Sequence, residues 1–446
     1  MRNKLLFVGF AALYAVLQLI PASVQAEEKG ILELYTLAKE KDPVVGRAEA
    51  RLEGSKADQE IAWSALLPRI NANASQRHLW HRVENYGPDL IDGSYAGFSY
   101  GVSGQLPVFN VPLHLQASAS GAGLKSAEAG TDVACQDLIV RLVNAYVALL
   151  KAQTDERLYR DELARVAEIL KQAEAFLKAG TGDIIAVYEA RARMDSAAAD
   201  LIKTEAQRKI AEQELSSLTG ITVSAVKDLP VIVPQGPSPD DLSWWITTMQ
   251  KNNPAIKQAQ EDLTQAGYTS SANRAAHLPT IQLSGGYTVD KGSTFLPEVE
   301  TKQWYIGASV SLPIYSGGET VARTRRAVAA ESERRYMLID VQDKNAKQLK
   351  EAFLNLQYNV SLAAAYQRKY DSTELQLKAT RKGREIGTRT AIDLLNAEQT
   401  WAVSRRDLSH ALYDNLLRHL QLRAAAGVLR ESDLQAAVNF SKPAAN

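Results

Sequence analysis

KAGTGDIIAV at residues 178–187 returns as EIGTRTAIDL at residues 385–394, an offset of 207 positions (385 − 178). Three more segments recur in the same order, at offsets of 211, 211 and 206 positions (252 − 41, 277 − 66 and 311 − 105). They are KDPVV at 41–45 with NNPAI at 252–256, LLPRI at 66–70 with HLPTI at 277–281, and QLPVF at 105–109 with SLPIY at 311–315. The chain is therefore a tandem duplication of a unit of roughly two hundred residues, much longer than the repeats of a solenoid.

Long helices with a seven-residue repeat surround the duplicated turn. From Leu142 in steps of seven, Glu156 is the only polar residue up to Leu177, which predicts left-handed coiled-coil packing. Shifted by 207 positions, the same seam continues in the second repeat as Leu349, Leu356, Ala363, Tyr370 and Leu377. A helix over about 115–178 would be roughly 95 Å long. Gly180, Gly182 and Gly387 then predict turns that fold each long helix back as a hairpin.

Each repeat also contains two segments with the alternation of an amphipathic strand. A helix over 30–66, ended by Pro68, precedes strands over 69–80 and 95–107, and the second repeat copies these strands over 281–289 and 303–312. Their length and their single apolar face are typical of strands in an outer-membrane barrel. A half-buried sheet in a soluble domain fits the alternation as well. In the membrane alternative, the lipid-facing side chains are Phe98, Tyr100, Val102, Ile281, Leu283, Tyr287, Trp304, Ile306 and Val310.

The chain divides into five predicted segments. These are a signal peptide over 1–26, a first repeat over 27–227, a proline-rich linker over 228–240, a second repeat over 241–430 and a C-terminal tail over 431–446, with fraying expected after Gly427. The signal peptide is indicated by Arg2 and Lys4 before an apolar run, and by small residues before Glu27. An uncleaved membrane anchor is the alternative. Beyond it we expect no membrane-spanning helix.

Composition argues against several classes of function. The chain has 51 Lys plus Arg and 51 Asp plus Glu, so nothing favours a nucleic acid or another polyanionic partner. Cys135 is the only cysteine, which excludes an internal disulfide, and the six histidines show no metal-ligand spacing. No phosphate-binding GxxxxGK motif occurs. We therefore expect no catalytic residue, cofactor or metal ion, and no enzymatic activity.

Four strands cannot close a barrel in lipid, because an open sheet edge leaves backbone groups without partners. If the strands span a membrane, the chain must oligomerise, with eight strands from two copies or twelve from three. A barrel continued by helices of this length predicts an oligomeric channel. Two other classes remain as alternatives: a periplasmic coiled-coil adaptor and a structural coiled-coil protein of the cell envelope.

Several segments resemble the TolC-like outer-membrane efflux and secretion channels. They are the two strand entries LLPRI and HLPTI, the segment LPIYSGGE at 312–319, the turn IGTRTAIDLLNA at 386–397 and GVLRESDL at 427–434. The resemblance covers nearly all of the chain after residue 26. It implies a homotrimer in the outer membrane of a Gram-negative bacterium, with a twelve-stranded barrel and a helical periplasmic tunnel. It also implies a passive duct for type I protein secretion, drug efflux or both. A periplasmic adaptor protein and an inner-membrane pump of the ABC or RND type would be its partners, and the sequence leaves the pump and the substrate open.

The resemblance also implies roles for residues of the two turns. Arg389 corresponds to a basic residue that holds the family's periplasmic gate closed, and Asp393 to an acidic ring at the constriction, whereas Asn396 replaces a second aspartate. Arg389 would have to bond to Asp183 or to a backbone carbonyl, because the family's usual polar partners are missing here. The pattern alone would make Arg389 and Asp393 solvated residues of a helix start. The expected adaptor contacts are Gly180, Gly182, Asp183, Gly387, Thr388 and Thr390.

Overall fold

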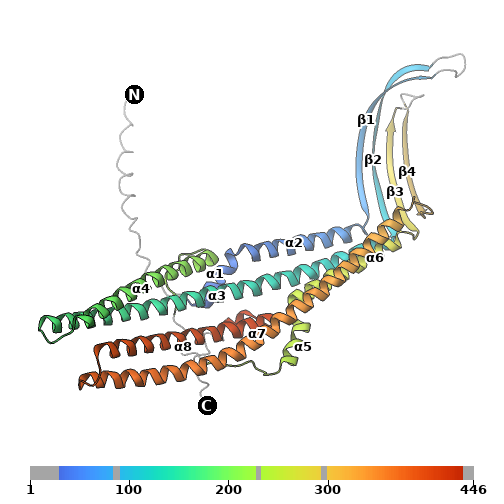
Figure 1. The fold of residues 1–446 in the computed structure, drawn as a ribbon. Coiled ribbons are helices and arrows are strands. Elements are labelled where there is room, and N and C mark those ends of the chain that lie inside the picture. The colour runs from blue at the N-terminus through green and yellow to red at the C-terminus, as the bar shows by residue number, and fades with distance from the viewer. Residues whose placement is uncertain (1–29, 84–90, 228–232, 293–298, 435–446) are drawn as a thin grey trace, which may run out of the picture.

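The computed structural model describes residues 30–83, 91–227, 233–292 and 299–434, so the predicted signal peptide lies outside the described residues. An elongated bundle of helices carries four strands that turn away from the bundle at one end (Figure 1). The elements are α1 (Ile31–Lys41), α2 (Pro43–Ser64), β1 (Arg69–Val83), β2 (Ile91–Phe109), α3 (Val111–Lys178), α4 (Ile184–Thr219), α5 (Leu242–Asn252), α6 (Pro254–Ala275), β3 (Thr280–Lys291), β4 (Glu300–Ser311), α7 (Glu319–Glu385) and α8 (Ala391–Ala425). The same order of elements occurs twice. A mostly helical, internally duplicated fold with four strands is therefore confirmed.

The segment predicted as one helix over 30–66 is helical, but it is not one helix, because the chain breaks at Asp42 into α1 and α2. Pro43 lacks an N–H and is suited to the first position of a new helix. The Asp42 carboxylate accepts hydrogen bonds from the N–H groups of Val44 and Val45, at 2.9 and 3.0 Å. Asn253 breaks α5 from α6 and caps α6 in the same way.

A glycine at the end of each returning helix lies against this break. Gly220 follows α4 with φ +69°, and Gly427 follows α8 with φ +74°. A side chain on Gly220 would meet Lys41, and one on Gly427 would meet the backbone of Asn252 and Asn253. The duplicated helical hairpin is thus fixed to its own N-terminal helix break in both repeats.

Asp42 carries a charge that its counterpart Asn253 lacks. The Asp42 side chain is 2% exposed, and the Arg141 guanidinium donates to both of its oxygens, at 2.8 and 3.2 Å. These hydrogen bonds hold the pKa of the Asp42 carboxyl below its usual value. A lowered pKa means that the charged form stabilises the fold above the unfolded pKa of about 4. This stabilisation is lost as the pH falls through the folded pKa.

We therefore expect Asp42→Asn to lower the stability of the helical domain by about 1–3 kcal/mol at neutral pH, because Arg141 loses its buried carboxylate. The difference from the unmodified protein should shrink as the pH falls below about 4, where both side chains are neutral. Thermal unfolding followed by circular dichroism at several pH values measures this. Asp137→Asn is the matched control, because Asp137 pairs with the same Arg141 at 2.7 Å but is 53% exposed. An equal loss in both variants would contradict the role of burial.

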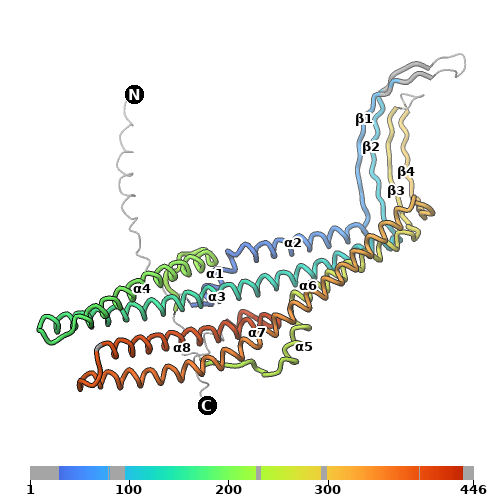
Figure 2. Tube along the Cα trace, in the orientation of Figure 1, coloured from blue at the N-terminus to red at the C-terminus, as the bar shows by residue number. Residues whose placement is uncertain are grey.

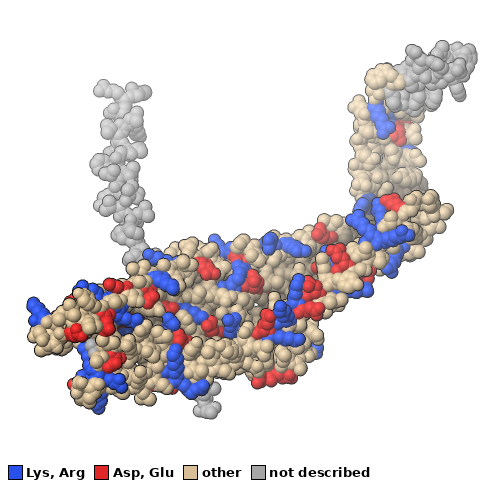
Figure 3. Space-filling view, in the orientation of Figure 1, with Lys and Arg blue, Asp and Glu red and all other residues tan. Residues whose placement is uncertain are grey.

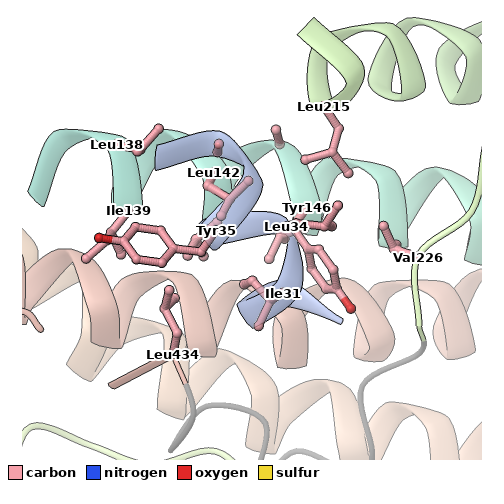
Figure 4. Packing of buried hydrophobic residues seen from close by; sticks show 14 of the residues in the cluster. Ile31, Leu34, Tyr35, Leu138, Ile139, Leu142, Tyr146, Leu215, Val226 and Leu434 are labelled. Carbon is pink, nitrogen blue, oxygen red and sulfur yellow. The ribbon is translucent and has the colours of Figure 1, made fainter. Parts of the chain in front are cut away.

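The predicted coiled-coil seam is confirmed. Leu142, Leu149 and Leu170 in the first repeat are buried, as are Leu349 and Leu356 in the second. Figure 4 shows how the main core gathers side chains from α1, α3 and α4. The polar residue of the seam, Glu156, is buried and pairs with Arg208 at 2.7 Å.

The segment after α8 is packed, not frayed. Leu429 and Leu434 belong to the main core, and Arg423 pairs with Asp433 at 3.0 Å. The expectation of fraying after Gly427 is therefore wrong for residues 428–434, and residues 435–446 lie outside the described residues.

One helix among the described residues, α3, contains a window with a mean hydropathy of 1.6, apolar enough to cross a membrane by length and composition. The expectation of no such segment after the signal peptide is wrong on that criterion. However, 56% of the window is buried inside the structure. Packing in the main core of the helical bundle accounts for its apolar composition.

The four strands form one antiparallel sheet in the order β1-β2-β3-β4. β1 and β2 are 15 and 19 residues long, longer than the predicted 69–80 and 95–107, because pairing continues as far as Val83 and Ile91. Among the described residues, β1 and β4 each pair with one strand, so the sheet has two open edges.

Candidate functional site

The two hairpin turns lie at the end of the molecule opposite the strands (Figure 2). Helices α3 and α4 enclose the turn 179–183, and α7 and α8 enclose the turn 386–390. Both hairpins point the same way and lie near one another, so residues separated by about two hundred positions lie at the same end of the helical bundle.

Both turns have the same hydrogen bonds. In the first, Gly180 has φ +74°, and the N–H of Thr181 donates to the carbonyl of Phe176 at 3.1 Å. In the second, Gly387 has φ +77°, and the N–H of Thr388 donates to the carbonyl of Gly383 at 2.8 Å. A positive φ at the residue after a helix is the usual glycine-dependent helix end.

Gly182 is required for a different reason, namely the space around it. A Cβ atom there would lie 2.6 Å from the backbone nitrogen of Leu177, so the turn has no room for a side chain. The predicted tip residues Gly180, Gly182, Asp183, Gly387, Thr388 and Thr390 therefore do lie in the two turns. Whether an adaptor contacts them stays a prediction.

Asp393 takes part in capping the N-terminus of α8. Its carboxylate accepts a hydrogen bond from the Thr390 N–H at 2.9 Å, and its own N–H donates to the Thr390 hydroxyl at 3.1 Å. This is a capping box. The hydrogen bond from the Thr390 backbone is the main cause that lowers the pKa of the Asp393 carboxyl, and the nearby positive charge of Arg389 lowers it further. Asp393 therefore has a structural role in addition to any role in the pore.

Arg389 and Asn396 are both exposed. In the described parts of this single copy, the Arg389 guanidinium makes no hydrogen bond or ion pair, and its Cγ lies near Gly383. Asp183 instead accepts from the Ile185 N–H at 3.0 Å and caps α4. The bond from Arg389 to Asp183 is thus not made within one copy, and the role of Arg389 as a gate residue stays a prediction.

A polar network near the tips was not predicted from the sequence. Glu398 of α8, with a side chain 12% exposed, lies 3.2 Å from Arg381 of α7 and 3.5 Å from Arg165 of α3. Nearer the turns, Arg384 donates to Gln172 at 2.9 Å. These contacts join the two hairpins close to the candidate gate. The sequence signal for this network was Glu398 itself, an acidic residue four positions after Leu394 on a buried helix face.

Leu395 adds an apolar contact between the hairpins. It packs in a small cluster with Val166 and Ile169 of α3. The neighbouring clusters around Leu170 and Leu377 are each confined to their own pair of helices. The hairpins are therefore internally apolar, whereas charged groups make up much of the contact between them near the tips.

The register of the sheet places the predicted lipid-facing residues on one surface. Val102 pairs with Tyr287, which pairs with Trp304, and Ile281 pairs with Val310. Directly paired residues share a face of a sheet. On β4, Trp304, Ile306 and Val310 are 78%, 73% and 68% exposed. Phe98, Tyr100 and Val102 are exposed as well, and Ile281 and Leu283 are half-buried. This surface has the exposed apolar character that lipid requires.

Comparison with known proteins agrees with this architecture. The family model described as "Outer membrane efflux protein" matches residues 34–221 and 245–428, one match per repeat. "Alkaline protease secretion protein AprF" of Pseudomonas aeruginosa is 28% identical, over 92% of this chain and 87% of the relative. "Outer membrane protein TolC" of Vibrio cholerae is also 28% identical, over 94% of this chain and 95% of the relative. The Campylobacter jejuni CmeC outer membrane channel has the same fold, with a TM-score of 0.78 and 19% identity, over 92% of this chain and 89% of that structure.

Proposed function

Because the chain belongs to the outer membrane efflux protein family, whose members are outer-membrane channels, we propose that it is the passive exit duct of a type I protein secretion system. The resemblance drawn from the sequence, the channel function and the outer-membrane location are confirmed. The finer assignment to protein secretion rests on the similarity to AprF, whose name describes secretion of an alkaline protease. Drug efflux is the second candidate, because the family as a whole is described by efflux.

We propose that the working form is a homotrimer. The observation that carries this proposal is the open four-stranded sheet, in which β1 and β4 each have a free edge. Pairing β4 of one copy with β1 of the next would satisfy these edges in lipid, and three copies would give twelve strands around a lumen. The long helices would continue this lumen into the periplasm.

The duct would be recruited by a periplasmic adaptor at the hairpin tips and fed by an inner-membrane pump. An ABC-type pump fits protein secretion, and an RND-type pump fits drug efflux. Transport through such a duct needs no chemistry on the substrate, so we propose no enzymatic activity, cofactor or metal ion. The five segment boundaries drawn from the sequence stay a prediction.

The channel proposal is tested by single-channel conductance of the purified protein in a planar bilayer, together with its oligomeric mass in detergent. A trimer with a discrete conductance supports the duct. A monomer without conductance would favour the periplasmic adaptor or the structural envelope protein instead. A second experiment expresses this chain in cells that lack their own duct and measures secretion of a protease. Restored secretion would separate protein export from drug efflux.

Asp393, Arg389 and Asn396 form the candidate constriction in this proposal. Asp393→Asn removes a negative charge and leaves an amide oxygen that can still accept from Thr390. If three copies of Asp393 line the pore, the cation-to-anion permeability ratio should fall roughly severalfold, because the local concentration of cations falls. Reversal potentials in salt gradients measure this ratio. Asn396→Ala is the control, since it changes no charge, and an unchanged ratio in Asp393→Asn would place Asp393 outside the pore.

A further inference from the structure

A cluster of arginines lies where the helices meet the strands. Arg323, Arg325 and Arg326 are in the first two turns of α7, and Arg274 is in the last turn of α6. The Thr324 hydroxyl donates to the carbonyl of Asn273 at 3.3 Å, which holds these two helix ends together. Figure 3 shows the basic side chains gathered at this junction, below the strands.

The junction is positively charged in a chain that is neutral as a whole. The segments that connect helices and strands at the junction, with the adjoining ends of both, are residues 59–69, 104–124, 267–280 and 312–326. They contain five arginines and two glutamates, a net charge of +3 per copy (5 − 2). Glu319 is paired with Arg323 at 2.5 Å. In the described residues, Arg274, Arg325 and Arg326 are exposed and make no ion pair.

The fold itself does not require this charge. The N-terminus of a helix carries a partial positive charge, so arginines in its first turns are unfavourable. Gly318 caps α7 without a side-chain hydrogen bond, and Glu319 is the acidic residue in the first turn of this helix. In the first repeat, the corresponding helix α3 has no lysine, arginine or acidic residue between Val111 and Lys125. The duplicated unit therefore forms without the cluster, and the second repeat retains it despite its cost.

Exposed apolar side chains lie beside the arginines. Ile314 and Tyr315, in the loop before α7, are 93% and 87% exposed. The loop is tied to the helix, because the hydroxyls of Ser316 and Thr320 are 2.8 Å apart. Arginines next to exposed aromatic and aliphatic groups are typical of protein surfaces at the boundary between acyl chains and headgroups.

We propose that Arg274, Arg325 and Arg326, with Arg323, form a collar that binds the phosphate groups of anionic phospholipids in the periplasmic leaflet of the outer membrane. The strands lie in the membrane and the helices in the periplasm, so the collar lies at the periplasmic boundary. Arginine pairs with phosphate oxygens through two parallel hydrogen bonds. Ile314 and Tyr315 enter the adjoining acyl-chain region, which extends the apolar surface of β4.

Native mass spectrometry of the full-length protein tests this proposal. The protein is released from detergent that contains equal amounts of phosphatidylglycerol and phosphatidylcholine. We expect preferential retention of phosphatidylglycerol. The triple variant Arg323→Gln, Arg325→Gln, Arg326→Gln should lower that retention roughly a hundredfold, at about fivefold per arginine. The matched control is Lys344→Gln, Lys347→Gln, Lys350→Gln, which removes the same charge from α7 about 30 Å further from the strands.

Three results would overturn the proposal. The first is an equal loss of phosphatidylglycerol from both triple variants, which would indicate an effect of total charge. The second is loss of the oligomer in the arginine variant whether or not anionic lipid is present, which would place these side chains between copies. The third is displacement of the retained lipid by millimolar inorganic phosphate, which would indicate a general anion site. Selective loss in an intact oligomer supports the collar.

Discussion

Gly427→Ala should destabilise the helical domain by about 4 kcal/mol or more, an exceptionally large effect for the addition of one methyl group. Gly427 has φ +74°, a conformation that costs any other residue roughly 1–2 kcal/mol. In addition, a Cβ atom would lie 2.3 Å from the Cα of Asn253. The obstacle is backbone at the capped break between α5 and α6, so no side chain can rotate out of the way.

Gly220→Ala is the matched control, because Gly220 has the same position in the first repeat. Its φ is +69°, so the backbone strain is similar. Its Cβ, however, would meet the Lys41 side chain at 3.2 Å, and this flexible chain can move. We expect a loss of about 1–2 kcal/mol. Thermal unfolding of both variants, followed by circular dichroism, gives the comparison. Similar losses would show that strain alone matters and that the close approach at Gly427 is unimportant.

This pair of glycines also shows what the sequence could and could not predict. The duplication, the heptads and the turns at Gly180 and Gly387 were predictable, because periodicity and turn chemistry are local properties. The contact of Gly427 with the break at Asn253 was not, because it joins residues that are 174 positions apart (427 − 253). The break itself was missed at Asp42, although the dipeptide Asp-Pro is a recognisable helix start.

The candidate gate was predicted only in part, for a similar reason. The resemblance placed Arg389 and Asp393 in one turn segment, and in the structure Arg389 lies in the turn whereas Asp393 lies in the first turn of α8. It did not reveal that Asp393 caps α8. The pattern Thr-x-x-Asp is compatible with a capping box, but an aspartate at this position is equally compatible with a residue that lines the pore. Glu398 was missed because one of its partners, Arg165, comes from the other hairpin and is distant in sequence.

The strands raise a different question, namely which face of the sheet contacts lipid. The sequence predicted alternation, and the register aligns the apolar residues of β2, β3 and β4 on one face. Alternation cannot tell lipid from a second protein layer, because both favour apolar side chains. The exposure of Ile306 at 73%, in a family of outer-membrane channels, favours lipid.

Ile306→Arg should therefore destabilise the barrel by about 2–4 kcal/mol per copy, the usual effect of an arginine that faces lipid near the middle of a membrane. Gly307→Arg places the same side chain at the same depth on the opposite face. A Cβ at Gly307 meets nothing within 4 Å, so the control introduces no clash in the protomer. Facing a water-filled lumen, this arginine should change stability by less than about 1 kcal/mol.

Urea titration of the folded protein in phospholipid vesicles, with folding read from heat-modified mobility on gels, measures both variants. In a trimer the substitution occurs three times, so the loss at Ile306 should prevent barrel assembly at urea concentrations that the Gly307 variant tolerates. The reverse order would mean that odd-numbered residues of β4 face lipid and that the assigned lumen is on the wrong side. Equal and small losses would mean that neither face meets acyl chains, because a soluble surface accepts an exposed arginine on either side of a strand.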